Sequence, residues 1–374
     1  MSTDAAPLPS LDDILRTARV VTLPLATRFR GIDVREALLF EGPEGWTEFS
    51  PFAEYDDVEA ATWLTAAIDY GWMPQPAPVR SEIPVNATVP AVAAASVPAI
   101  LARFDGCRTA KVKVAALRQA QGPGAAQGPA LRQAQGPGAA QGPGAAQGPG
   151  AGAGGRLTDD VARVRAVRET MGPEGRIRID ANGAWNVDEA ERALHALAEY
   201  DLEYVEQPCE TVEELAELRR RVKYMGIPIA ADESVRRASD PLAVARAGAA
   251  DLLVVKAQPL GGVTRALAIV AEAGLPAVVS SALDTSIGLA MGTALAAALP
   301  ELDYDCGLGT ASLFTADVAD PALLPRGGVV PVGRTTPDFA LLDEHAASAE
   351  RREWWLARLA RCYEALGGES SGGS

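Results

Sequence analysis

Three carboxylates stand at the ends of short apolar segments and are evenly spaced along the chain. Asp180 ends the segment RIRID, Glu206 ends LEYVE and Asp232 ends IPIAAD, with 26 residues between successive members. If they converge, each like-charge pair costs about 4 kcal/mol at 4 Å and an effective dielectric near 20, so they need protons or a cation. Oxygen ligands without Cys or His nearby favour Mg²⁺ over Zn²⁺.

The regular pattern continues further along the chain, now at intervals of 24 residues. Lys256 ends DLLVVK, Ser280 ends PAVVS, and Tyr304 lies in LDYDCG. A polar residue closing an apolar strand at this interval is typical of repeated β-α units, and the carboxyl ends of the strands of a parallel barrel meet at one mouth. The pattern predicts that the three carboxylates meet there with Lys256 opposite. The alternative, solvated loop acids, does not account for a phase kept over six units.

A pair of lysines precedes the carboxylates in the segment AKVKV, residues 110–114. Lys111 and Lys113 are two positions apart, so both side chains lie on the same face of a strand. In a barrel strand that face points into the mouth. The competing interpretation is an edge strand with two solvated lysines.

Composition narrows the functional class. The chain has 374 residues and a net charge of −15, which disfavours nucleic-acid and anionic-membrane partners. Its longest run of small apolar residues is too short to span a bilayer. The four cysteines have no metal-binding spacing and are interpreted as reduced thiols, so we expect a cytoplasmic enzyme. The oligomeric state stays open, a monomer included.

The chain divides into three predicted parts. Residues 1–82 are expected to form an α+β cap, with strands at 18–25, 35–42 and 45–50, a helix at 56–70, and a leader (1–15) that buries little. Residues 83–320 form the barrel. Residues 321–374 return to the cap through a helix at 346–365 and end in a flexible tail. The predicted barrel strands not yet named lie at 83–89 and 302–306. The helices after the second strand are predicted at 158–171, 187–200, 212–223, 240–247, 262–272 and 286–299.

Residues 117–155 differ from the rest of the chain. The segment ALRQAQGPGAAQGP at 116–129 is repeated at 130–143, and the stretch has no acidic, aromatic or β-branched residue. Such a sequence cannot bury enough apolar surface to offset its ordering entropy. It predicts a disordered insertion after the second barrel strand.

The motifs KVKV, DANG, EQP, ADES and VVKAQPLGG, in this order, resemble the muconate-cycloisomerase-like branch of the enolase superfamily. The resemblance implies a modified (β/α)₇β TIM barrel with an α+β capping domain. It implies Mg²⁺ held by Asp180, Glu206 and Asp232, and catalytic Lys111 and Lys113 facing Lys256. Residues 18–64 are similar to the o-succinylbenzoate synthases of high-GC Gram-positive bacteria. That similarity implies dehydration of 2-succinyl-6-hydroxy-2,4-cyclohexadiene-1-carboxylate in menaquinone biosynthesis.

The chemistry suits these residues. Removal of a proton next to a carboxylate produces an enediolate, which a divalent cation stabilises. An amine beside other cations gives up its proton more readily, so Lys113 is expected to be the general base and, by family analogy, to return the proton to the departing hydroxide. Lys256 would stabilise the enediolate and Lys111 would tune the base. His195 and His345 do not lie at strand ends, which excludes branches that use a histidine base.

Substrate contacts are expected from the cap and from two further strands. Arg28 and Arg30 lie in the segment 27–32 and could bind a carboxylate of the small-molecule substrate, or could be solvated loop arginines. Ser280 and Ser281 are candidates for the succinyl carboxylate. Arg178, two residues before Asp180, has a counterpart in the family.

Two alternatives remain at this stage. A dipeptide epimerase, an N-acylamino acid racemase or a muconate-type cycloisomerase would have the same fold and the same paired lysines. A non-catalytic relic, disabled by the insertion beside Lys113, would keep the fold without turnover.

Overall fold

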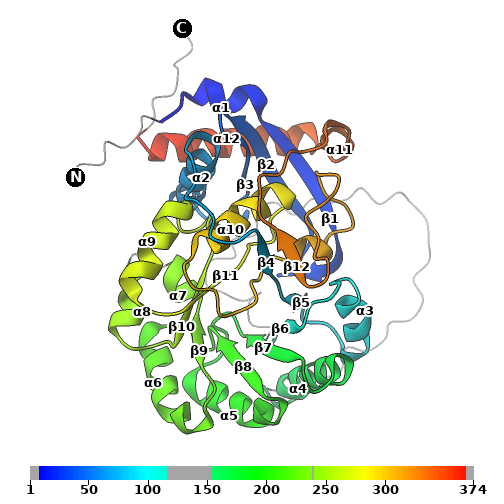
Figure 1. Cartoon of the computed structure of the whole chain (residues 1–374), viewed down its shortest axis with the longest axis vertical. Coiled ribbons are helices and arrows are strands. Elements are labelled where there is room, and N and C mark those ends of the chain that lie inside the picture. The colour runs from blue at the N-terminus through cyan, green and yellow to red at the C-terminus, as the bar shows by residue number, and fades with distance from the viewer. Residues whose placement is uncertain (1–7, 116–152, 238–239, 368–374) are drawn as a thin grey trace, which may run out of the picture.

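An α+β cap covers one end of a ring of parallel strands in the computed structural model of the chain (Figure 1). The structure describes residues 8–115, 153–237 and 240–367, with side chains of the second range from residue 157 onward. The predicted leader and tail therefore lie partly outside the described residues, at 1–7 and 368–374.

The cap is a three-stranded antiparallel sheet covered by helices. Its N-terminal elements are α1 (Leu11–Thr17), β1 (Arg19–Phe29), β2 (Ile32–Gly42), β3 (Gly45–Phe49) and α2 (Asp57–Trp72). Asp56 caps α2 by accepting a hydrogen bond from the backbone N–H of Glu59. The expectation that the first 15 residues bury little is wrong, because Leu11 and Ile14 of α1 are buried in the core.

The hairpin between β1 and β2 is longer and tighter than predicted. The predicted strands 18–25 and 35–42 leave a long connection between them, but both strands continue into it and only Arg30 and Gly31 form the turn. Both have positive φ, 50° and 82°. Polar residues in the segment obscured the strands, which project their tip toward the barrel mouth.

The C-terminal part of the chain returns to the cap, as predicted. It forms α11 (Phe339–Glu344) and α12 (Ala349–Ala365), and α12 packs against α2 (Figure 1). Arg358 of α12 is buried and donates hydrogen bonds to the backbone carbonyls of Phe52 and Tyr55. The end of the chain thus holds the segment between β3 and α2.

Seven short parallel strands form the barrel sheet in the order β11-β10-β9-β8-β7-β6-β5. Their bounds are β5 (Ala87–Val89), β6 (Thr109–Lys113), β7 (Arg176–Asp180), β8 (Leu202–Glu206), β9 (Ile229–Ala231), β10 (Leu252–Val255) and β11 (Ala277–Val279). The segment at Cys306 and Gly307 joins the two edges, since Cys306 bridges to Val85 and Gly307 to Ser280, both in parallel. We call each of the eight strand positions around the ring a stave. This segment forms the eighth stave, and the fold is the predicted (β/α)₇β barrel.

Helices follow the strands around the outside of the ring (Figure 1). They are α3 (Val97–Leu101), α4 (Ala153–Met171), α5 (Val187–Leu197), α6 (Val212–Val222), α7 (Glu233–Arg236), α8 (Ala243–Arg246), α9 (Val263–Ala273) and α10 (Ser286–Ala298). Asn186 and Thr211 form capping boxes with Glu189 and Glu214, which fix where α5 and α6 begin.

Four local predictions were wrong. The first barrel strand is interrupted, because β4 (Glu82–Pro84) pairs with β12 (Val329–Pro331) in a separate antiparallel sheet, and Pro84 has no N–H for a ladder. The last stave forms isolated bridges rather than a strand at 302–306. The helix expected at 240–247 is reduced to α8, and α7 had no sequence signal of its own.

The fourth correction concerns the insertion. Of the predicted disordered stretch 117–155, residues 117–152 lie outside the described residues. Residues 153–155 belong to α4, which begins five residues earlier than the predicted 158. No helix within the described ranges is both long and apolar enough to cross a membrane.

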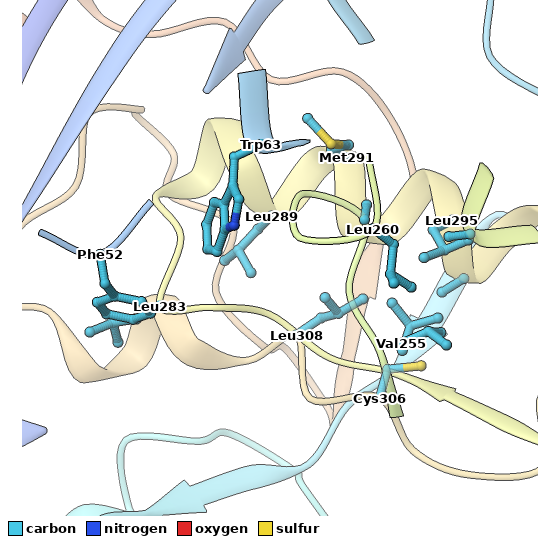
Figure 2. Close-up of a cluster of buried hydrophobic side chains, with 14 of the residues drawn as sticks. Phe52, Trp63, Val255, Leu260, Leu283, Leu289, Met291, Leu295, Cys306 and Leu308 are labelled. Atoms are coloured by element: carbon cyan, nitrogen blue, oxygen red, sulfur yellow. The ribbon is translucent and has the colours of Figure 1, made fainter. Parts of the chain in front are cut away.

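An apolar cluster joins the cap to the barrel (Figure 2). Figure 2 shows Trp63 of α2 beside Leu289 of α10, and Phe52 beside Leu283. All four are at most 3% exposed. Because these cap residues pack against α10 and the connection that precedes it, the position of the cap relative to the mouth is set by close packing.

A buried polar network reinforces this junction. Glu48 of β3 accepts hydrogen bonds at Oε2 from the N–H of Thr285 (3.1 Å), the hydroxyl of Thr285 (2.6 Å) and the N–H of Gly288 (3.0 Å). Arg35 of β2 donates to the backbone carbonyl of Leu283 (3.1 Å). The cap therefore holds the connection between β11 and α10 through backbone groups.

Replacement of Gly288 by alanine tests how rigid this junction is. Alanine is normally better than glycine in a helix by about 1 kcal/mol. Here its Cβ would lie 2.7 Å from Glu48 Cδ and 2.8 Å from Asp284 Cβ. We expect Gly288→Ala to lower the free energy of unfolding by about 1–3 kcal/mol in urea titrations. Gly333→Ala is the control, because its Cβ meets nothing within 4 Å; equal stability of the two variants would contradict a rigid junction.

Ionisation of Glu48 should make stability pH-dependent. Burial, together with Asp284, raises the pKa of Glu48 from 4.5 to about 7 against the opposing hydrogen bonds of Ser50 and Thr285 and the charge of Arg35. Between these values the folded state binds more protons than the unfolded chain, so the free energy of unfolding falls as pH rises.

Glu48→Gln removes this titration. From pH 5 to pH 8 the unfolding free energy of the variant, relative to wild type, should increase by about 2–3 kcal/mol. Denaturant unfolding of both proteins at the two pH values measures the change. A difference that does not vary with pH would show that Glu48 does not titrate in this range.

Candidate active site

The three evenly spaced carboxylates meet at the mouth of the barrel beneath the cap. Asp180 and Glu206 are the last residues of β7 and β8 and are partners across the sheet. Asp232 follows the last residue of β9. Their exposed fractions are 0%, 0% and 1%. The register of three adjacent parallel strands thus produces the cluster.

The lysines lie on both sides of this cluster. Lys111 and Lys113 project from β6, and Lys256 follows β10. Strands β6 and β10 are four staves apart in a ring of eight, so they face each other across the barrel. The three strands between them carry the carboxylates.

Each carboxylate is paired with an ammonium group. Lys113 Nζ lies 2.5 Å from Asp180 Oδ2, and Lys256 Nζ lies 2.5 Å from Asp232 Oδ2. Lys111 Nζ lies between two of the acids, 3.1 Å from Glu206 Oε2 and 3.9 Å from Asp180 Oδ2. The lysines therefore supply the positive charge that the buried acids require.

Burial and neighbouring charges set the ionisation of these groups. Burial and the nearby Asp180 raise the pKa of Glu206 to about 8, although Lys111 opposes the shift. Burial alone would raise the pKa of Asp180 and Asp232, but the facing lysines lower both. Burial would lower the pKa of Lys111, yet Glu206 and Asp180 raise it, so Lys111 stays protonated. For Lys256, burial outweighs Asp232 and lowers the pKa.

The acids are not arranged as a closed metal cluster. In the described part of the chain, no three His, Cys, Asp or Glu side chains are grouped to hold a metal ion. Each of the three acids is instead turned toward an ammonium group, and their role as metal ligands stays a prediction. The donor set still suits a hard cation: three buried carboxylates at adjacent strand ends, with oxygen donors only.

Two residues that the sequence analysis missed hold Asp232 in place. Gln207 is buried and accepts hydrogen bonds from the backbone N–H groups of Asp232 (3.0 Å) and Ser234 (3.2 Å). Arg236 of α7 is 3.0 Å from Asp232 Oδ1 and donates to the hydroxyl of Tyr55 in the cap. The EQP motif contained the signal for Gln207, but the short helix that places Arg236 had none.

The cavity beside these groups lies between the cap and the barrel. Its lining includes all three lysines and Asp232 from the barrel, and from the cap Phe29, Arg30, Phe52 and Tyr55. The space left free among these side chains is small, about 30 Å³. A larger ligand must therefore displace side chains that now fill the mouth.

Arg28 and Arg30, the two candidate arginines of the cap, have different surroundings. Arg30 lines the cavity and stacks on Phe52, with its guanidinium carbon 4.4 Å from the ring centroid. Arg35 lies 4.3 Å from the same ring. Arg28 does not line the cavity and instead donates to the backbone carbonyl of Gly31. Only Arg30 of the two candidates is therefore placed to meet a ligand.

The remaining candidates divide in the same way. Ser280 and Ser281 both line the cavity, and Lys111 Nζ lies 3.4 Å from Ser280 Oγ. Ser281 donates to the backbone carbonyl of Gly307 at 2.8 Å. Arg178 lies deeper in the barrel at 0% exposure, paired with Glu203 and donating to the carbonyl of Asp305, so it does not reach the cavity.

Groups next to the site complete its hydrogen bonds. Asn182 Oδ1 accepts from Lys113 Nζ at 3.0 Å, and Gln207 donates to Ser234 Oγ at 2.6 Å.

The two histidines lie away from the site. His195 contacts the hydroxyl of Tyr224, and His345 follows α11, so neither histidine is at the mouth.

A second hollow lies at the opposite end of the barrel, where α3 and α4 approach β6 and β7. It has a volume of about 860 Å³, and its lining combines apolar residues with Arg108, Arg176, Glu174, Thr170 and Cys107. It contains none of the carboxylates or lysines described above. Its larger volume therefore does not make it the site of the chemistry, which depends on the charged cluster.

Comparisons with known proteins agree with this architecture. Residues 99–337 match the family described as enolase C-terminal domain-like, and residues 20–71 match the enolase N-terminal domain-like family. The muconate lactonizing enzyme from Pseudomonas fluorescens superposes with a TM-score of 0.66 at 18% identity, covering 88% of this chain and 98% of that one. An N-succinyl Arg/Lys racemase from Bacillus cereus gives a TM-score of 0.66 at 16% identity, covering 88% of this chain and 96% of that one.

Sequence relatives are much closer. The o-succinylbenzoate synthase of Mycolicibacterium smegmatis is 50% identical over 95% of this chain and 98% of its own length. The enzyme of the same name from Mycobacterium leprae is 48% identical over 98% of each chain. The chain therefore belongs to the o-succinylbenzoate synthases, a family of hydro-lyases within the enolase superfamily.

Proposed function

We propose that this enzyme removes water from 2-succinyl-6-hydroxy-2,4-cyclohexadiene-1-carboxylate to form o-succinylbenzoate. The observation that carries the proposal is the placement of Lys113 and Lys256 on opposite staves, with three buried carboxylates on the strands between them. A substrate held across this space has an amine on each face of its ring. The choice of this reaction over others of the same fold is supported by the o-succinylbenzoate synthases named above.

Lys113 is the proposed base. In its neutral form it takes the proton from the ring carbon that bears the carboxylate, and the bonding electrons pass into that carboxylate as an enediolate. The carbon–oxygen bond to the hydroxyl group then breaks, the ring becomes aromatic, and Lys113 returns the proton so that water leaves. One proton is removed and returned, so the amine ends in its original state.

Lys256 and Lys111 have different proposed roles. Lys256 faces the other side of the ring and its positive charge stabilises the enediolate. Lys111 is held by Glu206 and Asp180 and stays protonated, so it serves as a fixed positive charge beside Lys113. Asn182, which accepts from Lys113, orients the base amine.

Asp180, Glu206 and Asp232 are the proposed ligands of Mg²⁺. A bound Mg²⁺ would stabilise the negative charge that develops on the substrate carboxylate. The residues support this assignment because they are oxygen donors at adjacent strand ends and are buried away from water. Arg236 and Gln207 keep Asp232 in position for the role.

Recognition of the substrate's second carboxylate is assigned to the cap and to the residues that directly follow β11. Arg30 is a cation at the cavity that the stacked Phe52 holds in place. Ser280 and Ser281 offer hydroxyl groups on the barrel side. The substrate is thus a small carboxylate, and no nucleic-acid or membrane partner is proposed.

An epimerase or racemase of the same fold is the second candidate. Amines on opposite faces suit removal of a proton on one side and its return on the other. Both reactions use the same lysines, so the product decides between them.

The first test measures product formation by the wild-type enzyme and the loss of kcat in variants of the two lysines. Purified enzyme with Mg²⁺ should convert the cyclohexadiene carboxylate to o-succinylbenzoate, followed by ultraviolet absorbance. Lys113→Ala and Lys256→Ala should each lower kcat by at least about 10³-fold, since each removes a group that acts in the transition state. Epimerisation of Ala-Glu without o-succinylbenzoate formation would show that the assignment of the reaction is wrong.

The second test removes the metal. EDTA should abolish turnover and added Mg²⁺ should restore it, and calorimetric titration should detect Mg²⁺ binding to Lys113→Ala but much weaker binding to Asp180→Ala. The variants separate loss of the base from loss of the ion. Full activity in excess EDTA would refute the metal requirement.

A further inference from the structure

Two buried side chains of α4 bind the backbone at the end of β6. Asp160 Oδ2 accepts a hydrogen bond from the N–H of Ala115 at 2.9 Å, and Arg163 donates to the carbonyl of Lys113 at 2.9 Å. The two side chains pair with each other at 2.7 Å and are only 6–7% exposed. We call this group, Asp160 with Arg163, the α4 clamp.

The α4 clamp also reaches the neighbouring stave. Arg163 Nε donates to the carbonyl of Val92 at 2.6 Å, just beyond β5. One planar guanidinium thus holds the backbone beyond β5, the end of β6 and a carboxylate of its own helix. Lysine cannot reproduce this, because its single ammonium lacks the rigid fork of donors.

The residue bound by Asp160 has an uncommon backbone. Ala115 has a φ of 57°, in the left-handed region that costs a non-glycine residue about 1–2 kcal/mol. Ala115 is buried, and Asp160 is the partner of its N–H within the described residues, so loss of this side chain would cost that hydrogen bond. The clamp therefore stabilises an unfavourable turn two residues after Lys113.

Lys113 is consequently held at both ends. Its carbonyl is bound by Arg163, and its ammonium is bound by Asp180 and Asn182. The backbone direction at Lys113 determines where Nζ lies relative to a substrate, and a displacement of about 1 Å can cost about 100-fold in rate.

We propose that Asp160 and Arg163 are positioning residues for Lys113: they fix the end of β6 from α4, whatever length of chain connects Ala115 to that helix. The proposal rests on the proposed function for the role of Lys113 as base. Neither residue lines the cavity, so they act through the backbone and not by contact with substrate. These contacts join the end of β6 directly to α4 and do not depend on residues 116–152, which connect the two along the chain.

A second Arg–Asp pair provides a matched control. Arg219 lies 2.6 Å from Asp251, whose other oxygen accepts from the N–H of Ile229, the first residue of β9. This pair also binds strand backbone, but at the end of the barrel opposite to the mouth. Its variants measure the effect of losing such a pair on stability alone.

The experiment compares Asp160→Asn, Arg163→Ala and Arg163→Lys with Asp251→Asn and Arg219→Ala. Each protein is assayed with Mg²⁺ well below its melting temperature, using substrate with hydrogen or deuterium at the abstracted position. We expect the clamp variants to lower kcat by about 10–100-fold with KM changed less than threefold and a larger isotope effect on kcat. The control variants should lower the melting temperature with kcat and the isotope effect unchanged.

Two results would overturn the proposal. One is a loss of kcat that follows melting temperature equally in the clamp and control variants. The other is a clamp variant with wild-type kcat and isotope effect. Full recovery of activity by Arg163→Lys would also contradict the requirement for a planar fork.

Hydrogen exchange separates this proposal from the proposed function. The Ala115 amide should be protected in the wild type and exchange at least tenfold faster in Asp160→Ala, whether or not o-succinylbenzoate forms. If the wild type makes no o-succinylbenzoate, the proposed function fails and the clamp is judged on exchange alone, where unchanged protection refutes it.

A shortened chain provides the last arm. Replacing residues 117–152 with a linker of about four glycine and serine residues should leave the fold, kcat and Ala115 protection intact, because closing a shorter loop costs less entropy. Asp160→Asn in this shortened chain should lower kcat as much as in the full chain. A shortened chain that is insensitive to Asp160→Asn would show that the clamp does not act independently of the connection.

Discussion

The burial of three like charges at the mouth of the barrel is the constraint on which the rest of the structure depends. Asp180, Glu206 and Asp232 are almost entirely removed from solvent, and isolated carboxylates in such a place would not stay ionised. Lysines from strands on either side compensate them. Glu206 shows that the compensation is incomplete, since its pKa is raised to about 8 even with Lys111 at hydrogen-bond distance. Burial is the largest cause of this shift, so a further cation beside Glu206 would favour its ionised form.

The barrel and the charged cluster could be predicted because they follow from a repeat. Each of Asp180, Glu206, Asp232 and Lys256 closes an apolar run, and the period of 24–26 residues leaves room for one helix and two short loops. Parallel register then requires that they converge. The two-residue spacing of Lys111 and Lys113 likewise fixes a shared face. These inferences use only strand geometry, which local sequence determines well.

The parts that could not be predicted depend on contacts between distant segments. Arg236 meets Asp232 and Tyr55 only because a four-residue helix follows β9, and no local pattern indicates so short a helix. Arg28 and Arg30 are indistinguishable in the sequence, yet the two-residue turn directs only Arg30 to the cavity. Asp160 and Arg163 look like ordinary polar residues of an amphipathic helix. Their partners lie 45 to 71 positions earlier in the chain, so only the folded structure shows what they bind.

The division of the chain into barrel and cap also limits which residues can determine substrate selectivity. Opposed lysines and a carboxylate cluster can remove a proton next to a carboxylate in many substrates, and solved structures of the same fold include both cycloisomerases and epimerases. Selectivity must therefore come from groups that the chemistry does not require. On the cap side the proposed groups are Phe29, Arg30 and Phe52, which line the cavity. Phe52 lies between Arg30 and Arg35, and Arg35 binds the carbonyl of Leu283 in the barrel. Arg30, the proposed recognition group, is thus linked through one aromatic ring to the connection between β11 and α10, so a change in either domain would move it without altering the lysines.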